Sequence, residues 1–261
     1  MPITSNWELA LNSCKTMKNF NFIWVILFGI GLVQTSCITS LFDTAGKVTT
    51  IERNADSIIG IKMYDRVNVE IIQDTVNKLF ITGPENYLSK VTTSFDNGSL
   101  TIEDNNSYGW YTGYDIELTA TIHVISLKSI YYEGVGNIFS ANTLVTDSLR
   151  IRSEKSAGDI NLHINASYFY CYFNQSAVDA KMFGNATRAH LQINGTGFIR
   201  CQDLLTNYCW VHNQGSGDIF ANASSSISGI IEGAGNVFFT GNPTNTSFAI
   251  QGRGTGEFIE Y

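Results

Sequence analysis

After about residue 50 the chain is organised by short stretches in which apolar and polar residues alternate. The clearest pairs in the second half are Leu149 and Ile151, Leu191 and Ile193, and Phe248 and Ile250. A period of two puts successive side chains on opposite faces of an extended chain, so these stretches are predicted strands. None shows the three- and four-residue spacing of an amphipathic helix, and helix is expected to be nearly absent after residue 45.

A Gly-x-Gly phrase, followed by Asn, Asp or Glu and an apolar residue, recurs between these stretches. Its copies span residues 133–139, 156–160, 194–199, 214–220, 232–238 and 254–258. Measured at the second glycine, the gaps are 22, 20, 18 and 21 residues, and a gap of 39 residues holds a degenerate copy at 175–180. A period of about 20 residues predicts a solenoid of stacked parallel coils. We expect the glycines to supply positive φ at a corner, and the adjacent Asn or Asp to tolerate left-handed backbone or bond its own backbone.

The first half of the predicted domain has a different pattern. Residues 67–71 and 116–124 alternate, and residues 79–82 end at a Gly-Pro turn. Asn97-Gly98 stands between two extended runs, which is a strong signal for a β-hairpin. These features predict antiparallel hairpins and irregular strands that form the first layer or cap of the solenoid, because an uncapped stack exposes an edge.

Residues 17–36 have the anatomy of a secretory signal peptide. They begin with Met17 and Lys18 and continue with an apolar run of about a dozen residues, which ends in small or polar residues before Cys37. The apolar run is shorter than the ~20 residues that span a bilayer. A signal peptide is therefore favoured over a membrane span. We expect translation to start at Met17, which makes residues 1–16 an upstream extension.

The position of Cys37 resembles a bacterial lipoprotein cleavage site. Thr35 and Ser36 fit its preference for small residues, whereas Gln34 stands where leucine is usual. We expect lipid attachment at Cys37, with residues 37–49 as a tether, because two acyl chains suffice for stable membrane anchoring. The alternative is an ordinary signal peptide or a tail anchor beside an incidental cysteine.

Composition narrows the class of protein further. Charged residues make up 15% of the chain, below the usual level of about 25%, as in extracellular β proteins rich in Ser, Thr and Asn. The formal charge of −7, without clusters of Lys and Arg, excludes a nucleic-acid-binding surface. Cys171, Cys201 and Cys209 are an odd set without tight spacing, so we expect buried free thiols rather than a disulfide framework.

The repeat and the strands before it resemble the auto-transporter adhesin head GIN domain family, which is common in exported lipoproteins of Bacteroidetes. The resemblance rests on the repeated Gly-x-Gly-Asp-Ile phrase behind the strand at 67–71 and the hairpin at 96–102, and it covers about residues 50–260. It implies a right-handed parallel β-helix related to pectin-lyase-like folds and the role of a surface adhesin. The family has no agreed catalytic residues to transfer. The chain departs from the pattern at Val178, where the glycine is missing, and at the doubled glycine run 252–256.

A carbohydrate-active enzyme on this scaffold needs carboxylates that converge on one groove. The best candidates are Asp159, Asp179 and Asp218 in one column, with Arg150 and Arg152 as the nearest basic pair. A phenylalanine interrupts that column, and aspartates two coils apart are about 10 Å apart, which is wide even for an inverting pair. We therefore expect no catalytic residues.

Metal and cofactor sites are not expected either. The sequence has no His-x-x-x-His or Cys-x-x-Cys spacing and no phosphate-binding loop leading into a helix. The histidines fall at different offsets from the repeat, so each is expected to be a strand-face residue: His123, His163, His190 and His212.

The loop at residues 105–114 is the candidate binding site. It places Tyr108, Trp110, Tyr111 and Tyr114 among Gly, Asn and Ser. Such loops resemble antibody paratopes, where Tyr and Trp give contact area at low entropic cost, and aromatic faces also stack on sugars. The alternative is that these rings fold back over the open end of the helix.

Together these features predict a signal peptide and tether followed by one β-helical domain at 50–261. The expected protein is a lipid-anchored adhesin of the bacterial outer membrane or cell surface. Its expected partners are the membrane and a glycan or surface protein, with the oligomeric state left open. The second hypothesis is a polysaccharide lyase or hydrolase on the same scaffold.

Overall fold

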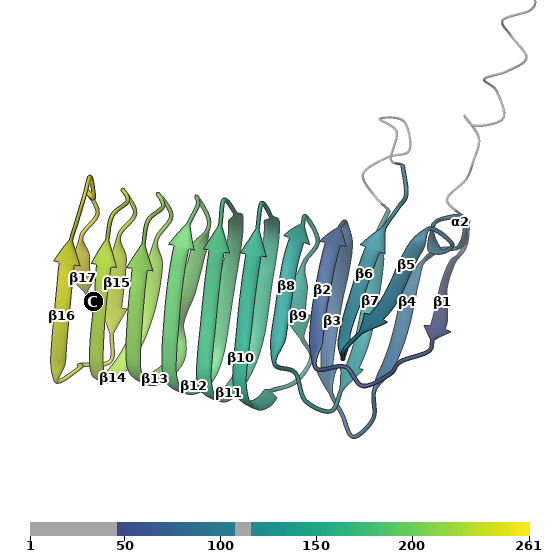
Figure 1. Ribbon diagram of the computed structural model, residues 1–261, viewed down its shortest axis with the longest axis horizontal. Helices are drawn as coiled ribbons and strands as arrows, with labels where there is room; N and C mark the ends of the chain where they lie inside the picture. The colour runs from purple at the N-terminus through teal and green to yellow at the C-terminus, as the bar shows by residue number, and fades with distance from the viewer. Residues whose placement is uncertain (1–45, 108–115) are drawn as a thin grey trace, which may run out of the picture. The chain divides into compact units, whose positions relative to one another are not determined.

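The computed structural model describes residues 46–107 and 116–261, which form a parallel β-solenoid of about seven turns (Figure 1). Over these residues the chain is almost entirely strand, and the helix found among them is α2, a single turn at Glu85–Leu88. No helix in the described ranges is long and apolar enough to cross a membrane. The expected all-β solenoid with nearly no helix is confirmed.

Hydrogen bonds join the described strands into one continuous sheet of 17 strands. The N-terminal strands are β1 (Val48–Arg53), β2 (Gly60–Asp65), β3 (Val67–Gln73), β4 (Lys78–Pro84), β5 (Val91–Asp96), β6 (Ser99–Asp104) and β7 (Leu118–Val124). The strands of the later coils are β8 (Ser129–Gly134), β9 (Ile138–Ser140), β10 (Leu144–Glu154), β11 (Ala157–Asn174), β12 (Ala177–Asn194), β13 (Phe198–Asn213), β14 (Ile219–Ile231), β15 (Val237–Thr240), β16 (Asn245–Ile250) and β17 (Phe258–Glu260).

Each coil has two faces because its long strand bends without breaking. The register of β10 with β11 skips Asp147 and Ser167, and these exposed residues turn the corner. We call the side formed after this bend face A and the side formed before it face B. Face A stacks β6, β2, β8, the later parts of β10 to β14, and β16 in parallel. Face B stacks β7, β3, β9, the earlier parts of β11 to β14, β15 and β17.

The core lies between the two faces and follows the alternation of the sequence. In β11 the most deeply buried side chains are Ile160, Leu162 and Ile164 on face B, and Phe169, Cys171 and Phe173 on face A. Each of these is at most 2% exposed, while most residues between them reach solvent. Burial of apolar area is the main favourable term in folding, so the stack of such coils stabilises the domain.

The N-terminal strands cap the solenoid and also insert one coil out of sequence order. Strands β2 and β3 lie between β6 and β7 on one side and β8 and β9 on the other, with parallel pairing throughout. Strands β1, β4 and β5 pair antiparallel at this end. The predicted hairpin is confirmed, since Asn97 and Gly98 have φ of 49° and 78°, as a type I′ turn requires.

The Gly-x-Gly phrases form the other corner, where face A passes into face B. The second glycines of the three clean copies, Gly136, Gly217 and Gly235, do not have positive φ. Glycine is required at these positions because there is no room for a side chain. A Cβ on Gly217 would lie well under 3.0 Å from the carbonyl oxygen of Gly197 in the preceding coil. The expectation of positive φ at this corner is wrong for these residues. Direct stacking of backbone on backbone is what requires glycine there.

Side chains after the second glycine tie neighbouring coils together. The Oδ1 atom of Asn137 accepts a hydrogen bond from the N–H of Asp159 at 3.0 Å. Asp218 accepts in the same way from Asn236 at 2.8 Å, and Asn236 accepts from Glu257 at 3.0 Å. We expected these side chains to bond their own backbone, and that expectation is corrected: they bond the backbone of the next coil.

The two irregular copies of the phrase keep the register. Val178 pairs with Gly158, and its side chain points into the core, where it is fully buried. In the doubled glycine run, the N–H of Thr255 bonds the carbonyl oxygen of Gly233 at 2.9 Å, which makes 254–256 the copy that stacks on the preceding coil. Both segments therefore belong to regular coils.

Candidate functional site: a groove on face A

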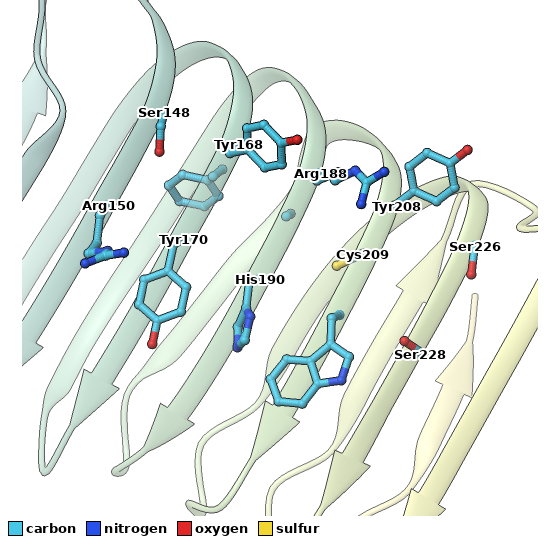
Figure 2. A pocket seen from close by; sticks show the side chains of 13 residues that line it. Ser148, Arg150, Tyr168, Tyr170, Arg188, His190, Tyr208, Cys209, Ser226 and Ser228 are labelled. Atoms are coloured by element: carbon cyan, nitrogen blue, oxygen red, sulfur yellow. The ribbon is translucent and has the colours of Figure 1, made fainter.

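The 20-residue period brings two rows of side chains together on the outside of face A. The first residue after the bend on each strand pairs with its equivalent on the next strand. We call these residues the corner row: Ser148, Tyr168, Arg188, Tyr208 and Ser226. The next outward position on each strand forms the central row: Arg150, Tyr170, His190, Trp210 and Ser228. Figure 2 shows the labelled members of both rows following one another from coil to coil.

A groove of about 570 Å³ runs between these rows. Its floor is formed by Phe169, Ala189 and Cys209, which point inward and are 2%, 4% and 4% exposed. Because side chains alternate along a strand, inward residues at these positions force their neighbours outward to form the walls. The corner row begins and ends with a short serine side chain, and the central row begins with Arg150 and ends with a serine (Figure 2). Because the serines are short, the groove is open along the solenoid axis.

Aromatic rings supply most of the walls. In the central row, the ring centroids of Tyr170 and His190 are 4.8 Å apart, and those of His190 and Trp210 are 4.1 Å apart. These rings are tilted against one another and hold one another in place. In the corner row, Tyr168 is 57% exposed and Tyr208 is 47% exposed. These two tyrosines are the aromatic surface that a ligand would meet first.

Two arginines in the walls have no acidic partner in the described part of the chain. The guanidinium carbon of Arg150 lies 5.4 Å from the centre of the Tyr170 ring, and that of Arg188 lies 5.2 Å from the centre of the Tyr208 ring. Within residues 46–107 and 116–261, no carboxylate forms an ion pair with either. The lining of the groove contains no Asp or Glu. The groove therefore carries positive charge that the described residues do not neutralise.

His190 adds a neutral polar group to the lining. Burial, helped by the nearby charge of His212, lowers the pKa of His190 below its ordinary value. Its Nε2 atom is buried and has no hydrogen-bond partner among the residues that the structure describes. Such unsatisfied buried atoms are rare in folded proteins.

The cysteine in the floor of the groove, Cys209, is an unreactive thiol. Cys209 is free and buried, and burial raises the pKa of its thiol to about 12. The thiolate is the reactive form, so this side chain acts as a small apolar group and not as a nucleophile. The predicted free, buried thiols are confirmed for Cys171, Cys201 and Cys209.

Comparison with known proteins identifies the family. Residues 59–243 match the family described as "Putative auto-transporter adhesin, head GIN domain". This match covers more than two thirds of the sequence. The chain belongs to the head GIN domain family. The resemblance seen in the sequence is confirmed, and the protein is an adhesin-like β-solenoid.

Solved structures resemble this head GIN domain over most of its length. A putative adhesin from Bacteroides fragilis NCTC 9343 is 26% identical, with a TM-score of 0.75 over 82% of this chain and 97% of that one. A putative lipid binding protein from Parabacteroides distasonis ATCC 8503 is 17% identical, with a TM-score of 0.61 over 82% and 97% of the two chains. The latter shows the fold alone. No curated protein matches the chain.

Two of the sites predicted from the sequence of this head GIN domain protein lie outside the described residues. They are the lipid-attachment residue Cys37 and the aromatic loop residues Tyr108, Trp110, Tyr111 and Tyr114. The candidate site on face A is separate from both in sequence.

The three aspartates of the enzyme hypothesis lie on face B at the Gly-x-Gly corner, away from the groove. Asp159 pairs with Asp179, and Asp179 pairs with Phe198, which confirms the predicted column and its interruption. Asp179 forms an ion pair with Arg200 at 2.8 Å, and Asp218 bonds backbone as described above. None of the three aspartates lines the groove on face A.

The predicted placement of the histidines on strand faces is confirmed. They lie on β7, β11, β12 and β13 in different registers. In the described part of the chain, no group of three or more His, Cys, Asp or Glu side chains is arranged to hold a metal ion.

The groove residues were not predicted, although the sequence carries a signal for them. Stepping by 20 residues from Arg150 reaches Tyr170, His190 and Trp210, and the same step from Ser148 reaches Tyr168, Arg188 and Tyr208. The inward cysteines in Tyr170-Cys171-Tyr172 and Tyr208-Cys209-Trp210 also imply that the flanking rings point outward. Aligning outward positions at this period would have assembled both walls.

Proposed function

We propose that this protein is an exported adhesin that binds glycan in the groove on face A, without catalysis, and is held at the cell envelope by a lipid at Cys37. The observation that carries the proposal is an open groove whose walls present two exposed tyrosines and whose lining contains no carboxylate. The family description and the adhesin from Bacteroides fragilis support a binding role.

The chemistry of the walls suits a sugar chain. Tyrosine rings offer flat apolar faces at low entropic cost, which is how paratopes and sugar-binding sites gain contact area. Serine hydroxyls at the ends of the groove both donate and accept hydrogen bonds, as sugar hydroxyls do. The parallel stack of coils holds these groups at fixed spacing, which lowers the entropic cost of binding.

The position of the acidic residues supports a role without catalysis. Glycoside hydrolysis needs a pair of carboxyl groups flanking the scissile bond. The groove offers serine, tyrosine, arginine and histidine instead, while Asp218 bonds backbone and Asp179 pairs with Arg200. Glycan turnover is therefore not part of the proposed function.

Replacing both exposed tyrosines, in a Tyr168→Ala/Tyr208→Ala variant, is expected to weaken glycan binding. Central aromatic contacts of this kind contribute about 2 kcal/mol together, or roughly thirtyfold in Kd. The measurement is a glycan array to find ligands, followed by calorimetric titration of the best one with wild type and variant.

The matched control is Tyr172→Ala, which removes a tyrosine from the same face but outside the groove. It is expected to bind as wild type does. Equal affinity of the double variant and wild type for every glycan bound would contradict the proposed site. Release of reducing sugar from bound glycans would contradict the absence of catalysis.

The proposed anchor makes a separate prediction. A Cys37→Ala variant is expected to lose incorporation of labelled palmitate and to leave the membrane fraction, because the acylated cysteine supplies the attachment. A Ser40→Ala variant is the matched control, since it changes the same tether and keeps Cys37. Palmitate labelling that persists in Cys37→Ala would exclude this anchor and leave the groove hypothesis untouched.

A further inference from the structure

We infer that the groove on face A takes an acidic polysaccharide, whose carboxylate or sulfate groups bind Arg150 and Arg188 while the chain lies along the solenoid axis. This inference rests on the proposed glycan-binding function and names the substrate class. Three observations support it: the two arginines form no ion pair with a described carboxylate, the groove runs along the solenoid axis, and its lining contains no carboxylate.

The two arginines differ from other arginines of the same coils. Arg152, two residues after Arg150 on the same strand, bonds Glu154 through Nε at 2.7 Å. Arg200 bonds Asp179 through Nε at 2.8 Å. All four arginines lie over aromatic rings, but Arg150 and Arg188 form no ion pair with a described carboxylate. The tyrosine rings under these two orient the guanidinium groups without supplying an acceptor. Their N–H groups remain available for a bidentate bond to a planar carboxylate or to a sulfate.

The placement of the arginines fits a repeating chain. Arg150 is in the central row on β10 and Arg188 is in the corner row on β12, so they stand on opposite walls two coils apart. Coils follow one another at about 4.8 Å, so this separation is about 10 Å along the axis. One sugar unit of an extended polysaccharide is about as long as one coil. The two guanidinium groups therefore match acidic groups carried on alternate sugars.

The charge of the whole protein sharpens the inference. The formal net charge is −7, so the surface at large repels polyanions. The groove differs locally from this average, because its two arginines form no ion pair among the described residues and its lining holds no Asp or Glu. Binding of an acidic chain should then depend on these two side chains and weaken as salt rises.

The test is a glycan array with matched pairs: uronate oligosaccharides beside their methyl esters, and sulfated oligosaccharides beside their desulfated forms. Wild type is expected to bind the acidic member of at least one pair about tenfold or more tightly than the neutral member. Arg150→Gln and Arg188→Gln are each expected to remove about tenfold of affinity for the acidic member and little for the neutral one. Arg152→Gln is the matched control and is expected to keep the preference.

Other outcomes separate this inference from the proposed function. Binding of neutral and acidic members alike, still lost in Tyr168→Ala/Tyr208→Ala, would overturn the inference and leave the glycan-binding groove standing. An acidic preference that survives both arginine variants would also overturn it. A protein that binds no glycan on the array would contradict both the inference and the proposed glycan-binding function. Binding of phosphatidylglycerol vesicles without binding of any glycan would contradict both in the same way.

Discussion

Gly217→Ala is expected to lower the free energy of unfolding by about 3 kcal/mol or more, since overpacking against backbone is costly and cannot be relieved by a rotamer change. The added Cβ would overlap the carbonyl oxygen of Gly197 in the preceding coil. That coil cannot move away, because the N–H of Ser216 bonds the oxygen of Gly195 at 2.9 Å and holds the two turns together. Gly217 does not have positive φ, so crowding alone is the cause.

The measurement is chemical denaturation followed by circular dichroism, with wild type and variant compared at the same protein concentration. Ser216→Ala is the matched control, because Ser216 is exposed on the same corner and alanine keeps its backbone hydrogen bond. The control is expected to change stability by less than about 0.5 kcal/mol. A Gly217→Ala protein as stable as this control would show that the corner does not stack backbone on backbone.

The second large effect is expected at Asn213, whose replacement by alanine should lower the free energy of unfolding by about 3 kcal/mol. Asn213 is fully buried and stands between Ile193 and Ile231 in the column of inward side chains. Its Nδ2 atom donates to the carbonyl oxygens of Gly217 at 2.9 Å and Asn236 at 3.2 Å. Its Oδ1 atom accepts from the N–H of Gly215 at 3.0 Å. Alanine would leave all three backbone groups without this partner.

Asn213→Asp separates hydrogen bonding from packing, because the side chain keeps its size. An ionised carboxylate would face two carbonyl oxygens, whereas the protonated acid can still donate to one of them. The folded state of this variant should therefore bind a proton more tightly than the unfolded state, and its stability should fall as pH rises. Denaturation at about pH 4 and pH 7 tests this, with Gln214→Ala as an exposed control on the same corner. A variant whose loss of stability is independent of pH would contradict the donor role of Asn213.

Much of the fold could be predicted because it depends on local pattern. Alternation defines strands, Asn97-Gly98 defines a hairpin, and the glycine period defines coils. The reason for the glycines could not be derived this way. Whether Gly217 needs a special φ or only space depends on what the preceding coil places beside it, and that is a contact between residues 20 apart in sequence.

The site was harder to predict because its chemistry depends on neighbours across coils. Arg150 and Arg152 both lie over tyrosine rings of the next coil, whereas only Arg152 forms an ion pair among the described residues, with Glu154. Likewise Asp179 is a candidate acid in the sequence and the ion-pair partner of Arg200 in the fold. Charge that remains available to a ligand becomes visible only once the register of the strands is known.

The parallel register of the long strands has an evolutionary consequence. Each coil adds one residue to each wall of the groove, and β11 and β12 pair over their whole length with the same register. Duplicating or deleting one such unit would lengthen or shorten the surface by a fixed step without redesigning the interior. In a domain built this way, the number of turns would set the length of the surface.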